Sequence, residues 1–219
     1  MPSKALQITC VAMLAAQVAT LAASDPGELT LTVPVYDYTG VPAVVLENAM
    51  AVAQRIFHDA GIATRWVQCG AAHESRRRSG CLEVLGTAHL FLRIVRSDWQ
   101  GSGGRPGRMG FALHDAEGRL GIYAYVFQQG VEGAIQFGGC GRLQVLGYAM
   151  AHEVGHLLLG GESHSATGIM QPHWDASQMV RKLGAVTFTS EQARRIQVNV
   201  ATRILAEQQS GPAQPATAP

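Results

Sequence analysis

The sequence has little charge, few aromatic residues and almost no excess of either sign of charge. Charged residues make up 15% of its 219 residues, aromatic residues make up 6%, and the formal net charge at pH 7 is +1. Nucleic-acid-binding proteins normally carry a basic surface, so this balance argues against a nucleic-acid partner. A hydrophobic fraction of 47% is too high for a disordered chain. The length therefore suits one globular domain, which we place at residues 24–208.

One segment lacks charge altogether and lies near the N-terminus. After Lys4, residues 5–23 are rich in alanine and end in small residues, which predicts a secretory signal peptide at residues 1–23. An uncleaved membrane anchor is the alternative, but Thr9, Gln17 and Thr20 make the segment only weakly hydrophobic. We expect a secreted or periplasmic protein without stable membrane association after cleavage. Nothing in the sequence indicates an oligomeric state.

Cysteine is scarce, with four residues in the chain. Cys10 would be removed with the signal peptide. Cys69 and Cys81 bracket a polar loop, and export places them where disulfides persist. We predict a Cys69–Cys81 disulfide, which would stabilise the fold by about 3 kcal/mol. Cys140 is then the odd cysteine. Pairing between chains and a thiol near a catalytic site are the alternatives, and we expect it to be buried and inert.

The hydrophobic pattern predicts a fold with alternating strands and helices. The first three predicted elements follow the order strand, helix, strand, which is typical of a parallel crossover. Residues 99–110 are glycine-rich and predict a loop, and residues 209–219 are a low-complexity tail that we expect to be disordered. The pattern indicates an α/β (α+β) domain. The predicted strands are 29–38, 62–68, 89–95, 111–114 and 121–127, and the predicted helices are 42–60, 142–159 and 191–208.

The predicted helix at residues 142–159 contains the pattern H-E-x-x-H at His152, Glu153 and His156. Positions four residues apart lie on one face of a helix, so both imidazoles can bind one zinc ion. Glu153 would not bind the metal; it would act as a general base on an activated water. Two satisfied core histidines with a surface glutamate are the structural alternative, but polar side chains are costly in so apolar a helix unless they are paired or bind a metal.

A catalytic zinc site needs a third protein ligand and one open position. Gly160 and Gly161 end the helix, and the chain returns through Glu162 and His164, of which His164 is our predicted third ligand. Glu162, His173 and Glu191 are the competing ligands. Glu191 follows Ser190, a possible N-cap of the last helix, so a role at that helix end explains it without a metal.

The sequence HEVGHLLLGGESHSATGIMQP resembles the metzincin clan of zinc peptidases, whose extended motif is H-E-x-x-H-x-x-G-x-x-H followed by a methionine-containing turn. The resemblance implies that Met170 forms a hydrophobic floor beneath the zinc site, although ordinary core packing would also suit a methionine. The chain departs from the clan's spacing, because Glu162 stands where the third histidine is expected and His164 comes two residues later.

The resemblance also implies the fold and the way a substrate binds. It implies a metzincin-like catalytic domain with a twisted mixed sheet, a backing helix, an active-site helix and a C-terminal helix. In the clan an edge strand above the metal binds the substrate backbone antiparallel. We assign this role to Gly110, Phe111, Ala112 and Leu113. His173 is a candidate for stabilising the oxyanion, and a surface position explains it equally well.

Two functional hypotheses follow from these residues. The first is a secreted zinc metallopeptidase, an endopeptidase acting on protein or peptide substrates, with Zn²⁺ as cofactor and Glu153 as general base. The second is a zinc-bearing domain that is not a peptidase, either a binding module or a hydrolase of another amide. Glu153 argues against a purely structural site, because a metal with four protein ligands would need no base.

Overall fold

The computed structural model describes residues 30–70, 81, 89–97, 108–114, 121–138, 141–161, 163–173 and 186–210. Within these residues a five-stranded mixed sheet is combined with four helices, which confirms the predicted α/β (α+β) class. The predicted signal peptide, Cys140, Glu162 and residues 99–107 of the predicted loop lie outside the described residues, and what was predicted for them stays a prediction.

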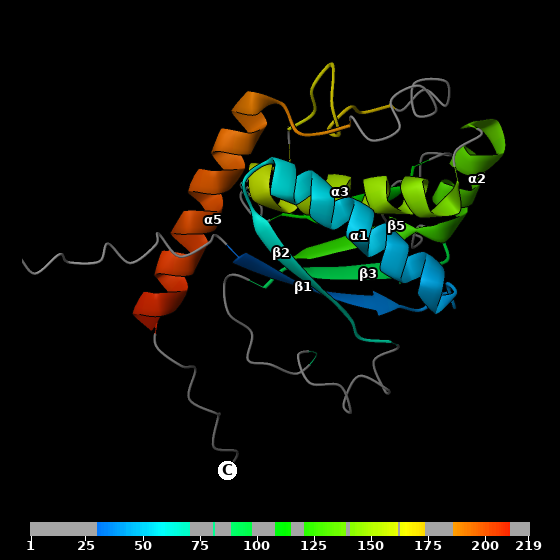
Figure 1. Cartoon of the computed structure of the whole chain (residues 1–219), viewed down its shortest axis with the longest axis horizontal. Coiled ribbons are helices and arrows are strands. Elements are labelled where there is room, and N and C mark those ends of the chain that lie inside the picture. The colour runs from blue at the N-terminus through cyan, green and yellow to red at the C-terminus, as the bar shows by residue number, and fades with distance from the viewer. Residues whose placement is uncertain are drawn as a thin grey trace, which may run out of the picture.

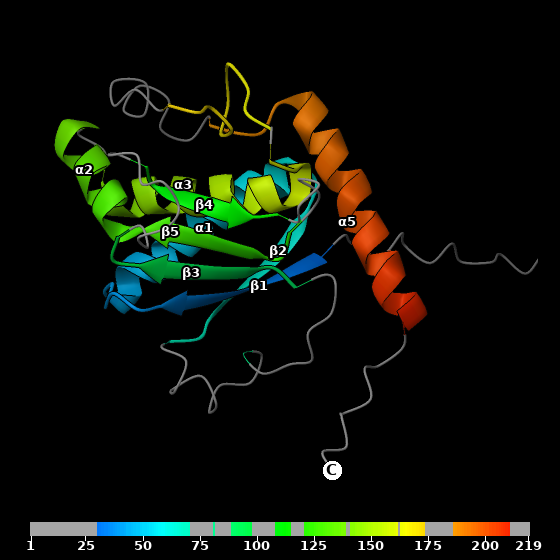
Figure 2. The same cartoon turned by 180° about the vertical axis from the view of Figure 1, so that it is seen from behind.

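The sheet has the strand order β2-β1-β3-β5-β4. β1 is parallel to both β2 and β3, and β3 is parallel to β5, so the predicted crossover from β1 to β2 is confirmed. β4 pairs antiparallel with β5 and forms one edge of the sheet, next to α3 in the view of Figure 2. The bounds are β1 (Thr30–Asp37), β2 (Ala63–Gln68), β3 (Phe91–Val95), β4 (Gly110–Leu113) and β5 (Tyr123–Phe127).

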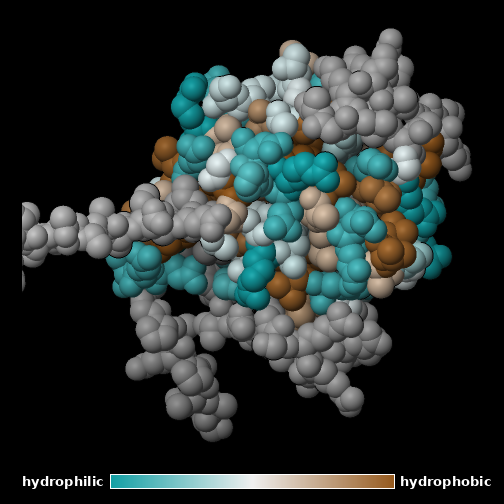
Figure 3. All heavy atoms as spheres, viewed as in Figure 1, coloured by the Kyte–Doolittle hydropathy of each residue, from teal (hydrophilic) through white to brown (hydrophobic). Residues whose placement is uncertain are grey.

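Two helices cover one face of the sheet (Figure 1). α1 (Ala43–Asp59) buries the residues that recur at helical spacing, and α3 (Arg142–Leu159) lies beside it. The two helices approach each other closely at Gly147, which has no side chain. A Cβ atom there would stand 2.7 Å from the backbone oxygen of Ala49. Hydrophilic residues are spread over the face that carries α1 (Figure 3), as expected for an amphipathic helix. The core between helices and sheet includes Leu31, Val33, Val35, Leu46, Ala53, Phe57, Leu92, Ile94, Val126 and Val154.

The structure contains one helix that the sequence pattern does not predict, α2 (Gln128–Gly138), which follows β5 without a break. Gly130 and Gly133 lower its intrinsic helix propensity by about 1 kcal/mol each, so the local pattern does not favour a helix. Gly130 is required by packing, because a Cβ atom there would overlap the backbone oxygen of Arg108. α2 therefore fixes the chain that enters β4.

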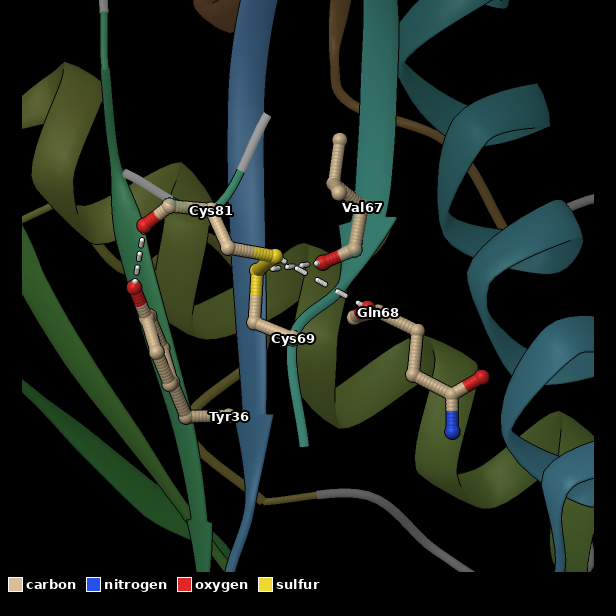
Figure 4. The surroundings of a disulfide bond; sticks show 5 residues. All are labelled: Tyr36, Val67, Gln68, Cys69 and Cys81. Atoms are coloured by element: carbon tan, nitrogen blue, oxygen red, sulfur yellow. Dashed lines mark hydrogen bonds between the residues drawn. A yellow bond between two sulfur atoms is a disulfide. The ribbon is translucent and has the colours of Figure 1, made fainter. Parts of the chain in front are cut away.

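The predicted Cys69–Cys81 disulfide is present, with the two Cα atoms 5.6 Å apart (Figure 4). Its sulfur atoms lie beside the backbone oxygens of Val67 and Gln68, and the Tyr36 hydroxyl donates a hydrogen bond of 3.0 Å to the Cys81 carbonyl. The bridge therefore ties Cys81 to the ends of β1 and β2.

The last helix, α5 (Ser190–Ser210), extends beyond the predicted range at both ends. Its N-cap is Thr189: the Gln192 N–H donates to Thr189 Oγ1 at 3.2 Å, and the Thr189 N–H donates to Gln192 Oε1 at 3.1 Å. This reciprocal pair is a capping box, and the assignment of the cap to Ser190 is wrong because only the residue three before Gln192 can complete it. Gln209 and Ser210, predicted to begin the disordered tail, are helical.

α5 stands against the end of the layer formed by α3 and the sheet (Figure 1). None of the described helices is long and apolar enough to cross a membrane.

Candidate metal centre

α3 carries the H-E-x-x-H residues and has the predicted bounds. It ends at Leu159, where Gly160 adopts a φ of 93°, a conformation that favours glycine. Glu153 and His156 are buried, with 5% and 8% of their surface exposed, and His152 is half-buried. α3 therefore presents these three polar side chains within its apolar second half.

His152 is oriented by the turn that contains Met170. Its Nδ1 lies 2.8 Å from the backbone oxygen of Ile169. A carbonyl oxygen can only accept a hydrogen bond, so Nδ1 carries the proton and Nε2 carries the lone pair. This is the arrangement found in histidines that bind metals, where the second ring nitrogen is held by a carbonyl or carboxylate.

His156 has two hydrogen-bond partners. Its Nδ1 lies 2.9 Å from the Ser163 hydroxyl, and its Nε2 lies 3.1 Å from Nε2 of His152. Without a metal, the His156 Nε2–H donates to His152 and the Ser163 hydroxyl donates to Nδ1. Because a hydroxyl can also accept, Nδ1–H can donate to Ser163 instead, which leaves Nε2 free to bind a cation. Ser163 therefore supports both tautomers.

His164 completes the group from the loop that follows α3. One ring nitrogen of each of His152, His156 and His164 lies within 4.8 Å of the others. Gln192 holds this loop on both sides of His164, since its side-chain N–H₂ donates to the Ser163 carbonyl at 3.0 Å and to Ser165 Oγ at 3.1 Å. The capping box of α5 thus positions the third histidine as well as the helix start.

The electrostatic environment keeps the three histidines neutral. Burial, opposed by the Ile169 hydrogen bond, lowers the pKa of His152 to about 4. Burial and the neighbouring His152 and His164 lower the pKa of His156 to about 3, and burial also lowers the pKa of His164. Neutral imidazoles are the form that binds metals.

The donor set fits a zinc ion. Three imidazoles are a common ligand set of catalytic zinc, and at Zn–N distances of about 2.0–2.1 Å two tetrahedral ligands lie about 3.4 Å apart. The Nε2 atoms of His152 and His156 are separated by a similar distance, 3.1 Å. Little movement would therefore be needed for these side chains to share a cation.

Glu153 lies between α3 and the edge strand β4. A Cβ atom at Gly110 would stand 2.7 Å from Glu153 Oε1, so only glycine allows the carboxyl group to lie here. Glu153 Oε2 is buried, and among the described residues it has no hydrogen-bond partner. Burial raises the pKa of Glu153 to about 8, and the positive charge of Arg108 opposes this increase.

The turn at residues 168–172 packs directly beneath α3. Met170 is fully buried, and a Cβ atom at Gly155 would stand 2.7 Å from its sulfur. Gly168 has a φ of 81°, and the Ile169 N–H donates to the Thr187 carbonyl at 2.8 Å. The methionine predicted to form the floor of the site is thus placed under the histidine-bearing helix.

The last four backbone oxygens of α3 all receive hydrogen bonds from side chains outside the helix. The His156 carbonyl also accepts a hydrogen bond of 2.9 Å from the Gly160 N–H. The carbonyls of the last three residues have no backbone partner within the helix, and positive charge near them is favourable. Three donors come from α5 at intervals of four residues, so they share one face of it. The pairs are His114 with His156 at 2.9 Å, Arg203 with Leu157 at 3.1 Å, Asn199 with Leu158 at 2.6 Å and Arg195 with Leu159 at 3.0 Å.

The remaining candidate residues have other positions. His173 is exposed and close enough to His164 to lower its pKa, and Glu191 is exposed in the first turn of α5. Among the described residues, neither belongs to the group of three histidines. Gly110–Leu113, predicted to bind substrate, form β4 at the edge of the sheet beside Glu153.

Sequence reasoning misses several residues that support the site. The residues that hold α3 and the His164 loop are His114, Gln192, Arg195, Asn199 and Arg203. The last three form a polar row at four-residue spacing within a predicted helix, a signal that the sequence does contain. Arg108 has no sequence signal beyond its place before the predicted edge strand.

No sequence-family model and no curated protein sequence matches the chain. Among solved structures, archaemetzincin from Methanopyrus kandleri has a similar fold, with a TM-score of 0.53 and 16% sequence identity. The match covers 80% of this chain and 98% of archaemetzincin. At this identity the similarity concerns the fold. Together with the three histidines, it supports a metzincin-like zincin.

Proposed function

We propose that this chain is a secreted zinc metallopeptidase. The observation that carries the proposal is the convergence of His152, His156 and His164 beside the buried carboxyl group of Glu153. Three protein ligands leave one position of a tetrahedral zinc site for water or substrate, which distinguishes catalytic from structural zinc sites. The name of the structural neighbour, archaemetzincin, agrees with the clan that the motif resembles.

Glu153 is the proposed general base. When bound, the zinc ion supplies Lewis-acid chemistry, polarising the scissile carbonyl and lowering the pKa of water. In its ionised form, which nearby positive charge favours, Glu153 would accept a proton from the attacking water and then donate it to the leaving amine. The position of the carboxyl group supports this role, because Oε1 lies against Gly110 of the edge strand and Oε2 is available for a hydrogen bond.

The edge of β4 that faces away from β5 is the proposed binding site of the peptide backbone. The Phe127 N–H donates to the Met109 carbonyl at 2.8 Å, so Met109 faces β5. In an antiparallel pair the direction alternates, and the N–H and C=O groups of Gly110 and Ala112 therefore point away from β5. An added substrate strand would bind these groups next to Glu153.

Secretion and the floor role of Met170 belong to the same proposal. The Cys69–Cys81 disulfide supports export, because disulfides persist mainly in oxidising compartments. The buried contact of Met170 with Gly155 supports a role in shaping the helix face that carries the histidines.

The test is cleavage of a diverse peptide library by the zinc-loaded protein and by its Glu153→Gln variant. Cuts made by the wild type and lost in the variant would support a peptidase with Glu153 as base. Glu47→Gln is the matched control, because Glu47 is exposed on α1, and it should cut like the wild type. Zinc binding without any cut would contradict the proposal and favour a binding module or a hydrolase of another amide.

A further inference from the structure

Arg108 lies beside the candidate metal centre but is not part of the H-E-x-x-H motif. Its side chain is exposed, and its Nε donates a hydrogen bond of 2.7 Å to the Gly110 carbonyl. Gly110 in turn contacts Glu153, since a Cβ atom there would stand 2.7 Å from Glu153 Oε1. The guanidinium and the proposed base therefore lie against the same residue of β4.

The guanidinium is held in place by packing. Its central carbon lies 5.7 Å from the centre of the Phe111 ring, and Phe111 stacks on Tyr125 with the ring centres 4.7 Å apart. The backbone of Arg108 packs against Gly130 of α2, where no Cβ atom would fit. A cation resting on an aromatic face loses less conformational freedom on binding a ligand than a freely moving side chain does.

Arg108 marks one end of the proposed substrate-binding edge. The Gly110 carbonyl that it binds points away from β5, toward the edge where a substrate strand would add. If that strand is antiparallel to β4, its chain runs from Leu113 toward Gly110. The position of Glu153 against Gly110 places the scissile bond at this end, so the residues that follow the scissile bond meet Arg108.

The charge of Arg108 is available to a substrate. Among the described residues Arg108 forms no ion pair, and its hydrogen bond to Gly110 uses Nε, not the two terminal nitrogens. The terminal nitrogens of a guanidinium form paired hydrogen bonds with a carboxylate.

We propose that Arg108 binds a carboxylate of the peptide substrate on the C-terminal side of the scissile bond. The carboxylate is either the C-terminus of the peptide or the side chain of an Asp or Glu residue. This inference rests on the proposed peptidase function and names its substrate class. Arg108 would thereby determine specificity without taking part in proton transfer.

The experiment compares three forms of one peptide that the library shows to be cut. The first has a free C-terminal carboxylate one or two residues after the cut, the second is its C-terminal amide, and the third is an amide with Glu directly after the cut. The wild type should cleave the first or the third with a kcat/KM about tenfold or more above that of the second. Preference for the first indicates a C-terminal carboxylate, and preference for the third indicates a side chain.

Three variants test the assignment to Arg108. Arg108→Gln should bring the ratio of kcat/KM between the carboxylate peptide and its amide close to one. Arg108→Lys should retain part of the preference for the carboxylate, because the positive charge remains. Arg55→Gln removes an exposed arginine from α1, which packs toward the opposite edge of the sheet, and should leave the ratio unchanged. Equal cleavage of all three peptides by the wild type would overturn the proposal, as would a ratio that survives Arg108→Gln.

Binding separates this proposal from the proposed function. Titration calorimetry on the zinc-loaded Glu153→Gln protein should show tighter binding of the carboxylate peptide than of its amide, and adding Arg108→Gln should abolish the difference. If the wild type cuts nothing while this difference is found, the peptidase function fails and carboxylate recognition by Arg108 stands. If the wild type cuts peptides and no difference is found, carboxylate recognition fails alone.

Discussion

Gly155 and Met170 are in direct contact: a Cβ atom at Gly155 would stand 2.7 Å from the methionine sulfur. Gly155 precedes His156 in α3, and Met170 follows Ile169, whose carbonyl accepts the hydrogen bond from His152. The distance between the histidine-bearing helix and the turn beneath it therefore depends on the absence of a side chain at residue 155.

Gly155→Ala should weaken zinc binding. The added methyl group would press on Met170 and on the Phe188 ring, 2.9 Å from the Cβ position, and would shift the Ile169 carbonyl that orients His152. Overpacking costs about 1–3 kcal/mol, partly offset by the better helix propensity of alanine. We expect about tenfold weaker zinc affinity, the size of effect seen when groups that orient ligands are lost. Competition with a coloured chelator measures it.

Gly133→Ala is the matched control for this substitution. Gly133 lies in α2, and nothing lies within 4 Å of its Cβ position. Alanine there should raise the free energy of unfolding by about 0.5–1 kcal/mol and leave zinc affinity unchanged. Equal effects of the two substitutions on zinc affinity would show that the contact with Met170 has no part in the site.

The stability of the metal-free protein should depend on Glu153 and pH. The pKa of Glu153 is raised from 4.5 to about 8, so the folded state retains a proton that the unfolded state loses. The stabilisation is complete below about pH 4.5 and is lost as pH rises through about 8. Glu153→Gln removes this loss. With zinc chelated, urea denaturation measures the free energy of unfolding of both proteins. Between these pH values, that of the variant should increase relative to that of the wild type by on the order of 4 kcal/mol.

The comparison between these two proteins isolates one group. The histidines of lowered pKa destabilise the folded state as pH falls below about 6.5, and they do so equally in the wild type and in the variant. A difference in stability that stays constant from pH 4 to pH 9 would contradict the neutral, buried state of Glu153.

Zinc content should identify the third ligand. His164→Ala should reduce zinc to far below one ion per chain after dialysis, because the remaining two histidines cannot hold the ion. His173→Ala and Glu191→Ala should retain one ion per chain, since neither side chain belongs to the group formed by the three histidines. Elemental analysis measures the content. Loss of zinc in the Glu191 variant alone would assign the ligand to α5.

Arg203 should contribute strongly to stability. It is 8% exposed and donates hydrogen bonds to the carbonyls of Gly121 and Leu157. Arg203→Ala leaves both oxygens without this donor and should lower the free energy of unfolding by about 2–3 kcal/mol. Arg194→Ala, an exposed arginine on the same helix, should change it by less than about 0.5 kcal/mol. Chemical denaturation measures the free energy of unfolding of both variants. Similar losses in the two would show that the hydrogen bonds of Arg203 do not contribute strongly to stability.

The disulfide should stabilise the fold by restricting the unfolded chain. Replacing both Cys69 and Cys81 by serine should lower the free energy of unfolding by about 3 kcal/mol, because the bridge joins residues 12 positions apart in the chain. Reductant should destabilise the wild type by a similar amount and leave the double variant unaffected. Free alkylation of both thiols in the unreduced protein would show that the bridge does not form in solution.

The elements of the fold could be predicted where the hydrophobic period was strong. α3 has the bounds that its apolar run indicates. β1 and α1 are each one residue shorter than predicted at both ends, and β2 is one residue shorter at its start. α2 could not be predicted, because its two glycines oppose helix formation and the need for one of them arises only from the backbone of Arg108. The start of α5 is defined by a capping box between Thr189 and Gln192, and predicting it requires that both residues be recognised as partners.

The candidate site also contains some features that the sequence predicts and others that it does not. The spacing of His152, Glu153 and His156 is a local property of one helix, so the sequence contains it. The approach of His164, the glycine contact of Glu153 and the hydrogen bonds from α5 join residues far apart in the chain, and no local pattern encodes them. Gln192, for example, acts on residues 163 and 165 through a side chain that sequence alone presents as one more polar position in a helix.

The end of α3 accepts hydrogen bonds from side chains of α5, a helix that is synthesised later. This sets the order in which the two helices can fold together during synthesis. The backbone oxygens of Leu157, Leu158 and Leu159 leave the ribosome well before Arg195, Asn199 and Arg203, which supply their hydrogen bonds. A nascent chain that has reached residue 173 already contains His152, His156 and His164 but lacks the helix that anchors the end of α3 and the loop of His164. We therefore expect the group of three histidines to reach the arrangement described here only when α5 docks. A chain that ends before α5 would contain the three histidines without the hydrogen bonds that align them.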